Sequence, residues 1–385
     1  MSLVYADNNA TTAVAPEVFE AMRPFLTERY GHPSSMHTFG GAVHHEIERA
    51  RSKVAALIGA AEPSEIIFTS CGTESDNTAI VSTLRSYPEK RHIITTKVEH
   101  PAVLSLCRYL EGVGYRVTYL NVDNEGLLDI NELKSAIDPD TALISIMHAN
   151  NETGVLFPIE EIAEIARVHN IVFHTDAVQA VGKIPLNMTQ LPVDLLSFSG
   201  HKLHAPKGVA ALYVRRGTKF TPFLIGGHQE QGRRGGTENV ASIVALGAAC
   251  ELAASTINEE YTRVKKLRGA LENTLLTKVP NARVNGHRLQ RLPNTTNISF
   301  EFIEGEAILL MLDEKGIAAS SGSACTSGSL TPSHVLRAMG TPFTYLQGSI
   351  RFSLSRYNTE EDINYIIEHL PAIIVRLREI SPYGK

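Results

Sequence analysis

Tryptophan is absent from the 385-residue chain, and cysteine occurs only four times, at Cys71, Cys107, Cys250 and Cys325. The cysteines are widely spaced and include no CxxC pair, so the sequence indicates neither a cysteine-rich zinc site nor a disulfide scaffold. A strong excess of one charge is also missing, because 36 Lys and Arg residues face 41 Asp and Glu residues. Nucleic-acid binding through bulk charge is therefore not expected.

Long apolar runs are lacking as well. The most apolar stretch, residues 240–250, is closed by Glu251 and is too short to span a bilayer, so we interpret it as part of a buried helix. The first basic residue is Arg23, and no apolar run follows the N-terminus, which is unlike a signal peptide. We expect no membrane association and a reducing, cytoplasmic compartment.

Histidine is plentiful, with fifteen residues. The adjacent pair His44 and His45, and the pair His201 and His204, have no third ligand at a spacing typical of a metal site. No metal is expected.

Short β-rich runs alternate with amphipathic helical stretches over roughly the first 256 residues. This alternation predicts an α/β fold with helices on both faces of a mainly parallel, seven-stranded sheet. The expected strands are residues 66–70, 92–96, 116–121, 142–148, 171–176, 195–198 and 209–214. Expected helices among them are residues 76–84, 101–112 and 159–169.

The pattern changes after about residue 256. A long charged helix is expected at 258–277, followed by strands at 296–302 and 349–354 and helices at 304–315 and 359–378. Thr359 with Asp362 is a suitable N-cap of the last helix. We therefore predict a large domain of residues 16–256 and a smaller α+β domain formed by residues 1–15 and 257–385.

Residues 70–75 (SCGTES) end an apolar strand and begin a helix. Free backbone N–H groups and the helix dipole at such a place suit a phosphate, and Thr73 adds a hydroxyl. The alternative is an ordinary capped turn, with Thr73 or Ser75 as the N-cap.

Three other candidates lie where predicted strands end. Asp176 closes an apolar strand, where open α/β sheets bind ligands, although it is equally suited to cap a helix. His100 lies in a similar position before Pro101. Lys202 follows a strand within residues 199–202 (SGHK); a partly buried lysine there can form a Schiff base, whereas most lysines are simply solvated.

Two candidates lie in the last quarter of the chain. Residues 320–329 contain five Ser and two Gly around Cys325, which predicts a mobile loop of about residues 320–332 that exposes a useful thiol rather than an incidental one. Arg351 lies within a β pattern and faces either solvent or a pocket, where its guanidinium would match a carboxylate. The other three cysteines are interpreted as small core residues.

In this order, the features resemble the class V aminotransferases, which are pyridoxal-phosphate enzymes of fold type I. The matching motifs are residues 5–12 (YADNNATT), 31–37 (GHPSSMH), 73–77 (TESDN), 148–154 (HANNETG) and 233–239 (RRGGTEN). With residues 320–325 (SSGSAC), the chain looks like a cysteine desulfurase. Cys71 before Gly72, and the tail LREISPY at 377–383, resemble the nitrogen-fixation type.

The resemblance implies a role for each matched residue. Lys202 would bind pyridoxal phosphate covalently and take the Cα proton, His100 would stack on the ring, and Cys325 would receive sulfur as a persulfide. Asp176 would pair with the pyridine nitrogen and Gln179 with the phenolic oxygen. The phosphate would be held by Gly72, Thr73, Ser199, His201 and, from a second subunit, Thr237. Asn151 and Arg351 would receive the substrate, and Asn151 would also contact the cofactor.

The implied protein is a homodimer that converts L-cysteine to L-alanine and passes sulfur to an iron–sulfur scaffold protein, including scaffolds for nitrogenase cofactor assembly. One alternative is a selenocysteine lyase or another class V aminotransferase, although a transaminase has no use for Cys325. A non-catalytic scaffold or partner protein of the same fold is the alternative from a different class.

Overall fold

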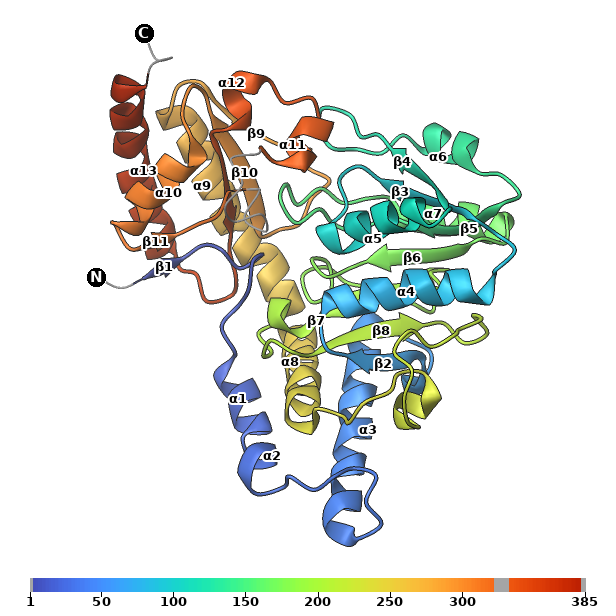
Figure 1. The fold of residues 1–385 in the computed structure, drawn as a ribbon. Helices are drawn as coiled ribbons and strands as arrows, with labels where there is room; N and C mark the ends of the chain where they lie inside the picture. Colours follow the sequence, from blue (N-terminus) through green and yellow to red (C-terminus); the bar gives the residue numbers. More distant parts are fainter. Residues whose placement is uncertain (1–2, 322–331, 382–385) are drawn as a thin grey trace.

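The computed structural model describes residues 3–321 and 332–381. Its centre is a seven-stranded sheet in the order β2-β8-β7-β6-β5-β3-β4 (Figure 1). The strands are β2 (Ile66–Thr69), β3 (His92–Thr96), β4 (Arg116–Leu120), β5 (Thr141–Ser145), β6 (Val172–Asp176), β7 (Leu195–Ser199) and β8 (Ala210–Val214). Only β8 runs antiparallel to its neighbours, so the predicted α/β fold with a mainly parallel sheet is confirmed.

Helices cover both faces of this sheet because every central strand is apolar on both sides. Ile93 packs in one apolar cluster with residues of α4 and α5, whereas the next residue, Ile94, packs in another with residues of α3, α7 and α8. Such alternation is what a strand's period of two produces when both faces are buried. The helices of this part are α1 (Pro16–Met22), α2 (Pro24–Thr27), α3 (Thr38–Ile58), α4 (Gly72–Ser86), α5 (Pro101–Gly112), α6 (Ile130–Ala136), α7 (Ile159–Val168) and α8 (Val240–Glu259).

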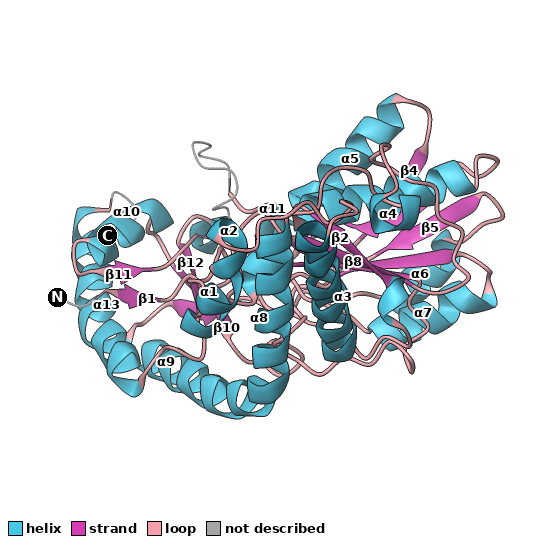
Figure 2. Cartoon of the chain, turned by 90° about the horizontal axis from the view of Figure 1, so that it is seen from below, coloured by secondary structure: helices cyan, strands magenta, loops and turns pink. Residues whose placement is uncertain are grey.

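A second apolar core is built from residues 4–6 and from residues 264–377. It lies on an antiparallel sheet of β9 (Ala282–Val284), β10 (Thr295–Phe300) and β12 (Ser349–Ser353), while β1 (Val4–Tyr5) pairs with β11 (Ile317–Ala318). The helices that pack in this core are α9 (Lys265–Lys278), α10 (Gly305–Asp313) and α13 (Glu360–Ile380). Two short helices, α11 (His334–Ala338) and α12 (Phe343–Leu346), instead bury their apolar residues in the first core. Figure 2 shows the two sheets at opposite ends of the molecule, which supports the proposed division into two domains.

The proposed boundary falls inside one continuous helical run. In this run α8 passes through a π-helical turn, Glu260–Val264, directly into α9. By length and composition the run could cross a membrane, but half of its most apolar window is buried inside the protein. Since α8 packs against α1 and α3, its apolar character is explained by the core, and the evidence for a membrane span is weak.

Several element boundaries differ from the sequence predictions. The strand expected at 142–148 leaves the sheet after Ser145, because residues 146–150 turn toward the cavity described below. Helix α3 was not predicted, since two glycines and two exposed histidines (Gly40, Gly41, His44 and His45) interrupt its apolar pattern; it buries Val43 and Ile47. The N-cap of the last helix is confirmed: Thr359 and Asp362 form a reciprocal capping box at the start of α13.

Candidate active site

A cavity of about 290 Å³ lies where the carboxyl ends of β2, β3, β5, β6 and β7 meet the segment of Asn9 and Ala10 and strand β12. Parallel strands bring their carboxyl ends to one edge of a sheet, which is the usual ligand site in open α/β folds. Ten of the residues predicted from the sequence line this cavity: Gly72, Thr73, His100, Asn151, Asp176, Gln179, Ser199, His201, Lys202 and Arg351. The chain therefore brings together side chains that are as much as 279 positions apart (351 − 72).

One end of the cavity is the N-terminus of α4. Cys71 is the N-cap, and its side chain makes no capping hydrogen bond, so the helix presents its first N–H groups to the cavity. A Cβ atom at Gly72 would lie only 3.1 Å from Val178 Cγ2. Glycine therefore lets the backbone approach closely, and the site suits an anion.

Asp176 lies at the end of β6, where its Oδ1 atom accepts a hydrogen bond of 2.9 Å from the Val178 N–H. Burial raises the pKa of Asp176 to about 6. The neighbouring Asp76, also buried, has a pKa raised well above its usual range by burial and then by the charge of Asp176. Because burial and the charge of Asp176 both disfavour ionisation of Asp76, Asp176 is the carboxylate of the two that suits a cationic partner.

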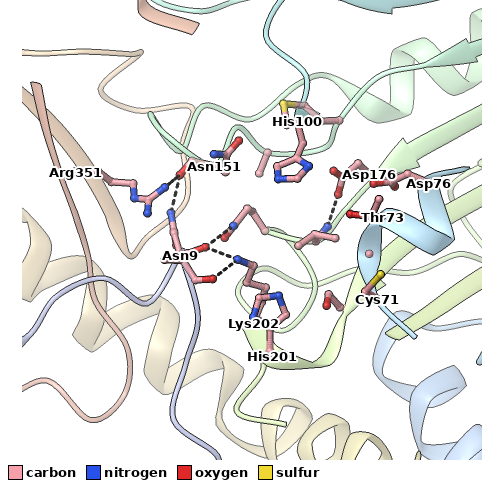
Figure 3. A pocket seen from close by; sticks show the side chains of 17 residues that line it. Asn9, Cys71, Thr73, Asp76, His100, Asn151, Asp176, His201, Lys202 and Arg351 are labelled. Atoms are coloured by element: carbon pink, nitrogen blue, oxygen red, sulfur yellow. Dashed lines mark hydrogen bonds between the residues drawn. The ribbon is translucent and has the colours of Figure 1, made fainter. Parts of the chain in front are cut away.

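Lys202 is presented by a short 3-10 turn, Gly200–Lys202, directly after β7. Its Nζ atom donates to the main-chain oxygens of Asn9 and Ala10, each at 2.6 Å. Figure 3 shows Lys202 and His100 on opposite sides of the cavity, with Asp176 and Arg351 at opposite ends. A flat group between them would touch the amine on one face and the imidazole on the other.

His100 is the N-cap of α5, and its Nδ1 atom accepts a hydrogen bond of 3.1 Å from the Ala102 N–H. Burial, followed by the charge of Lys202, lowers the pKa of His100 to about 4. A neutral imidazole whose Nδ1 accepts must carry its proton on Nε2. The ring is therefore uncharged at neutral pH and suited to stacking. Burial and then Lys202 likewise lower the pKa of His201 to about 4.

Arg351 projects from β12 and is 3% exposed. Its Nη2 atom donates to Asp7 Oδ1 at 2.8 Å, and its Nη1 atom donates to the main-chain oxygen of Asn151 at 3.0 Å. Its Nε atom is buried without a partner among the described residues. Of the two orientations left open by the sequence, Arg351 therefore has the one that faces the cavity, and a donor remains for a ligand carboxylate.

The arrangement fits pyridoxal phosphate. The helix terminus at Gly72, together with Thr73, Ser199 and His201, offers donors for a phosphate, and the buried Asp176 carboxylate suits a protonated pyridine nitrogen. The amine of Lys202 lies in the same cavity. A buried carboxylate beside a lysine and an anion site is the combination that this cofactor requires.

The remaining two predicted residues are Thr237 and Cys325. Thr237 lines a separate cavity of about 170 Å³ with Ser70, Glu230 and Arg234. Cys325 lies in residues 322–331, outside the described part of the chain. Its role and that of Thr237 stay predictions.

The interpretation of the other cysteines is partly wrong. Cys107 and Cys250 are buried as expected, and burial raises the pKa of Cys107 to about 12. Cys71, in contrast, is exposed and lines the cavity. Its place as N-cap of α4 turns it toward the anion site rather than into the core.

Asn9 is a site residue that the sequence does not reveal, although it belongs to the matching motif of residues 5–12. Asn9 is 1% exposed, and its main-chain oxygen accepts from Lys202 Nζ and, at 3.0 Å, from Gln179 Nε2. Its Nδ2 group donates to Asn151 O at 3.2 Å and to Thr295 Oγ1 at 2.8 Å. No pattern in the local sequence announces these contacts, because all of them join distant segments. Among residues 3–321 and 332–381, no group of three or more His, Cys, Asp or Glu side chains could hold a metal ion.

Comparison with known proteins gives one consistent result. The family model for aminotransferase class-V matches residues 4–366. A cysteine desulfurase of Trichormus azollae is 62% identical over 383 residues, covering 100% of this chain and 96% of that protein. The cysteine desulfurase NifS of Azotobacter vinelandii is 58% identical over 383 residues, covering 100% and 95%.

A solved structure described as a NifS-like protein superposes with a TM-score of 0.92 at 41% identity, covering 98% of this chain and 100% of that one. The family match, the high identities and the fitting cavity agree with one another. The chain therefore belongs to the aminotransferase class-V family of pyridoxal-phosphate-dependent enzymes and, within it, to the cysteine desulfurases.

Proposed function

This cysteine desulfurase acts on L-cysteine with pyridoxal phosphate, and we propose a role for each side chain of the cavity in binding or catalysis. One observation carries the proposal: Lys202, His100, Asp176 and Arg351 converge on a single cavity from four different strands or strand ends. The reaction of an amino acid substrate on this cofactor needs four groups at one point: a base, a stacking ring, a carboxylate and a guanidinium.

Four groups would hold the phosphate of the cofactor: Gly72, Thr73, Ser199 and His201. Asp176 would bind the ring nitrogen, Gln179 the phenolic oxygen, and His100 would lie against the ring face, with Asn151 at its edge. Lys202 would form the covalent link. When bound, pyridoxal phosphate supplies an electron-withdrawing ring that stabilises negative charge at the substrate Cα.

Arg351 would grip the carboxylate of L-cysteine through its buried guanidinium, with the help of Asn151. Lys202 would then remove the Cα proton, because its amine lies on the cavity wall opposite His100. With its Nδ1 atom accepting from Ala102 and its proton on Nε2, the uncharged His100 is suited to lie against the ring face rather than to take up a proton.

Cys325 would collect the sulfur. Its thiolate would attack the substrate sulfur, forming an S–S bond while the Cβ–S bond breaks and its electron pair stays with the carbon skeleton, which takes up protons and leaves as L-alanine. The described residues on both sides of the Cys325 segment support this role. Ser320 pairs with the backbone of Arg351, and His334 Nε2 donates to Glu99 O at 2.9 Å, directly before His100.

The decisive experiment is to incubate the holoenzyme with L-cysteine and a thiol reductant and to quantify alanine and sulfide together. Equal amounts are expected, and Lys202→Ala should abolish both. Cys325→Ala should still bind cofactor and cysteine but form no persulfide, while Cys71→Ala, a change at the exposed thiol of the same cavity, should still form it. If the cofactor-loaded protein makes neither alanine nor sulfide, the result would favour a selenocysteine lyase. Normal persulfide formation in Cys325→Ala would overturn the assignment of that residue.

A homodimer completes the proposal. Apolar side chains are exposed around α1, α2 and the start of α3, which project from the body in Figure 1; they are Phe19, Leu26, Tyr30, Met36 and Phe39. Such a patch is typical of a surface covered by another subunit. Thr237, which is outside the cavity of its own chain, would reach the phosphate site of that second subunit.

We further propose that the persulfide sulfur goes to an iron–sulfur scaffold protein, including one that serves nitrogenase cofactor assembly, in the cytoplasm. An exposed Cys71 and a thiolate nucleophile both fit a reducing compartment. The test is to follow labelled sulfur from cysteine to a purified scaffold. Label that reaches only free sulfide would argue against direct transfer.

A further inference from the structure

Lys183 is a buried lysine to which the mechanism above gives no task. It is 7% exposed and lies seven residues after the end of β6, in the helical turn that also carries Gln179. Gly182, with a φ of +76°, precedes it, and a Cβ there would lie 2.4 Å from Leu203 Cδ2. Glycine is therefore required for the turn that directs Lys183 back toward Gln179.

The Lys183 ammonium donates to two amide oxygens rather than to a carboxylate. Its Nζ atom lies 2.7 Å from Gln179 Oε1 and 3.2 Å from Asn9 Oδ1. Burial, followed by the charge of Lys202, lowers the pKa of Lys183 to about 7, and the carboxylate of Glu260, which is itself paired with Arg356 at 2.9 Å, opposes this only in part. Burying a cation against two neutral groups costs free energy, so a compensating role is expected.

Lysine has only donors, whereas an amide has one accepting and one donating end. Because Lys183 occupies Gln179 Oε1, the amide of Gln179 is fixed with its NH2 group on the other side, where Nε2 donates to Asn9 O at 3.0 Å. Gln179 lines the cavity. The fixed orientation means that a cofactor oxygen next to Gln179 meets N–H donors and never the amide oxygen.

We propose that Lys183 is a positioning residue: it locks the Gln179 amide in the orientation that donates to the phenolic oxygen of pyridoxal phosphate and thereby stabilises the ionised form of that oxygen. The inference rests on the proposed function, in which Gln179 contacts this oxygen. Without Lys183 only the hydrogen bond from Nε2 to Asn9 O would hold the amide, so the flipped orientation, in which the amide oxygen faces the cofactor oxygen, becomes accessible.

The test is a pH titration of the visible absorption of the holoenzyme without cysteine, so that its outcome is independent of desulfuration. Lys183→Met should raise the midpoint of the cofactor's absorption change by about one pH unit, the equivalent of one charge-assisted contact. The titratable or charged side chains that line the cavity are unchanged in this variant; they are Cys71, Asp76, His100, Asp176, His201, Lys202 and Arg351. An unchanged midpoint would overturn the proposal.

A double-mutant cycle shows whether Lys183 acts through Gln179. Gln179→Met alone should raise the midpoint, and Lys183→Met should add nothing in that background. Asn294→Ala is the matched control, because Asn294 Nδ2 is the other donor to Asn9 Oδ1, at 3.1 Å; it should leave the midpoint unchanged. A full additional shift in the Gln179→Met background, or an equal shift in Asn294→Ala, would overturn the proposed route.

Thermal unfolding of each apoprotein controls for the fold. If Lys183→Met does not fold, Lys183→Gln retains polarity at the buried position but can also accept, so it frees the Gln179 amide and should shift the midpoint in the same direction. If the folded Lys183→Gln variant has an unchanged midpoint, Lys183 does not fix the orientation of the Gln179 amide. If the midpoints shift as expected but the wild-type protein makes no alanine from cysteine, the proposed role of Lys183 holds and only the proposed reaction is refuted.

Discussion

Arg351 is bound to Asp7 in this structure, with 2.8 Å between Nη2 and Oδ1, although Asp7 is far more exposed than its partner. The two residues come from opposite ends of the chain, and Arg351 also lines the cavity. A substrate carboxylate that reaches the guanidinium therefore finds one donor already paired with an anion. Asp7 is both a support for Arg351 and a competitor of the substrate.

The first prediction separates these two effects. Asp7→Asn keeps a hydrogen-bonding side chain but removes the competing charge, so KM for L-cysteine should fall by about fivefold, the equivalent of about 1 kcal/mol. Arg351→Lys should raise KM by about 10- to 100-fold, since the forked contact is lost. Steady-state kinetics at fixed pH measure both. A rise in KM for both variants would show that Asp7 only orients Arg351.

The second prediction concerns Glu152, which accepts a short hydrogen bond from Ser333 Oγ, the N-cap of α11. Burial raises the pKa of Glu152 to about 7. A carboxyl group whose pKa is raised in the folded state binds its proton more tightly there than in the unfolded state. Its contribution to the stability of the fold is complete below the unfolded pKa and is lost as the pH rises toward 7.

Glu152→Gln removes this titration but retains an acceptor for Ser333. Between pH 5 and pH 8, the free energy of unfolding of the wild-type apoprotein should fall by about 2–3 kcal/mol relative to that of the variant. Denaturant unfolding of both proteins across this range provides the measurement. Parallel stability curves would mean that Glu152 does not titrate there.

The sequence allowed the site to be predicted wherever an apolar strand ends at a chemically active side chain. Asp176, His100 and Lys202 stand at such points, and a parallel sheet brings those points together. Asn9 and Lys183 could not be found this way, because their contacts run to main-chain oxygens and amides from remote segments. Helix α3 was missed for a different reason: its apolar face is specified by the sheet and by α8 rather than by its own hydropathy.

The third prediction concerns the segment that carries Thr237. Glu74 in the first turn of α4 accepts from Arg234 Nε at 2.7 Å and from Arg234 Nη2 at 3.0 Å. Burial alone would raise the pKa of Glu74, but hydrogen bonds from Arg234 and Ser70 outweigh it, and the pKa is lowered. The ionised pair ties residues 233–239 to the helix that forms the anion site.

Glu74→Gln should therefore weaken cofactor binding by about tenfold, since Arg234 loses a charged bidentate contact. Equilibrium titration of the apoprotein with pyridoxal phosphate measures the effect. Glu62→Gln is the matched control, because it breaks a 2.7 Å pair with Arg216, and neither residue lines the cavity. Tighter binding in Glu74→Gln would show instead that the negative charge of Glu74 opposes the phosphate.

The last prediction concerns which subunit Thr237 serves. In its own chain Thr237 lies outside the cavity that holds Lys202, and we propose that it donates to the phosphate bound by the partner subunit. Thr237→Val alone should weaken cofactor binding by about tenfold through the loss of one hydrogen bond to a charged group.

Mixed dimers make the assignment unambiguous at limiting cofactor. If Thr237 acts across the interface, a hybrid of a Lys202→Ala subunit with a Thr237→Val subunit keeps one intact site, because both defects fall on the other, and it should show about half of the wild-type activity. A hybrid of a doubly substituted subunit with a wild-type subunit spreads the defects over both sites and should be much less active. If Thr237 acted within its own chain, the order of the two hybrids would be reversed, since the wild-type subunit of the second hybrid would then be complete.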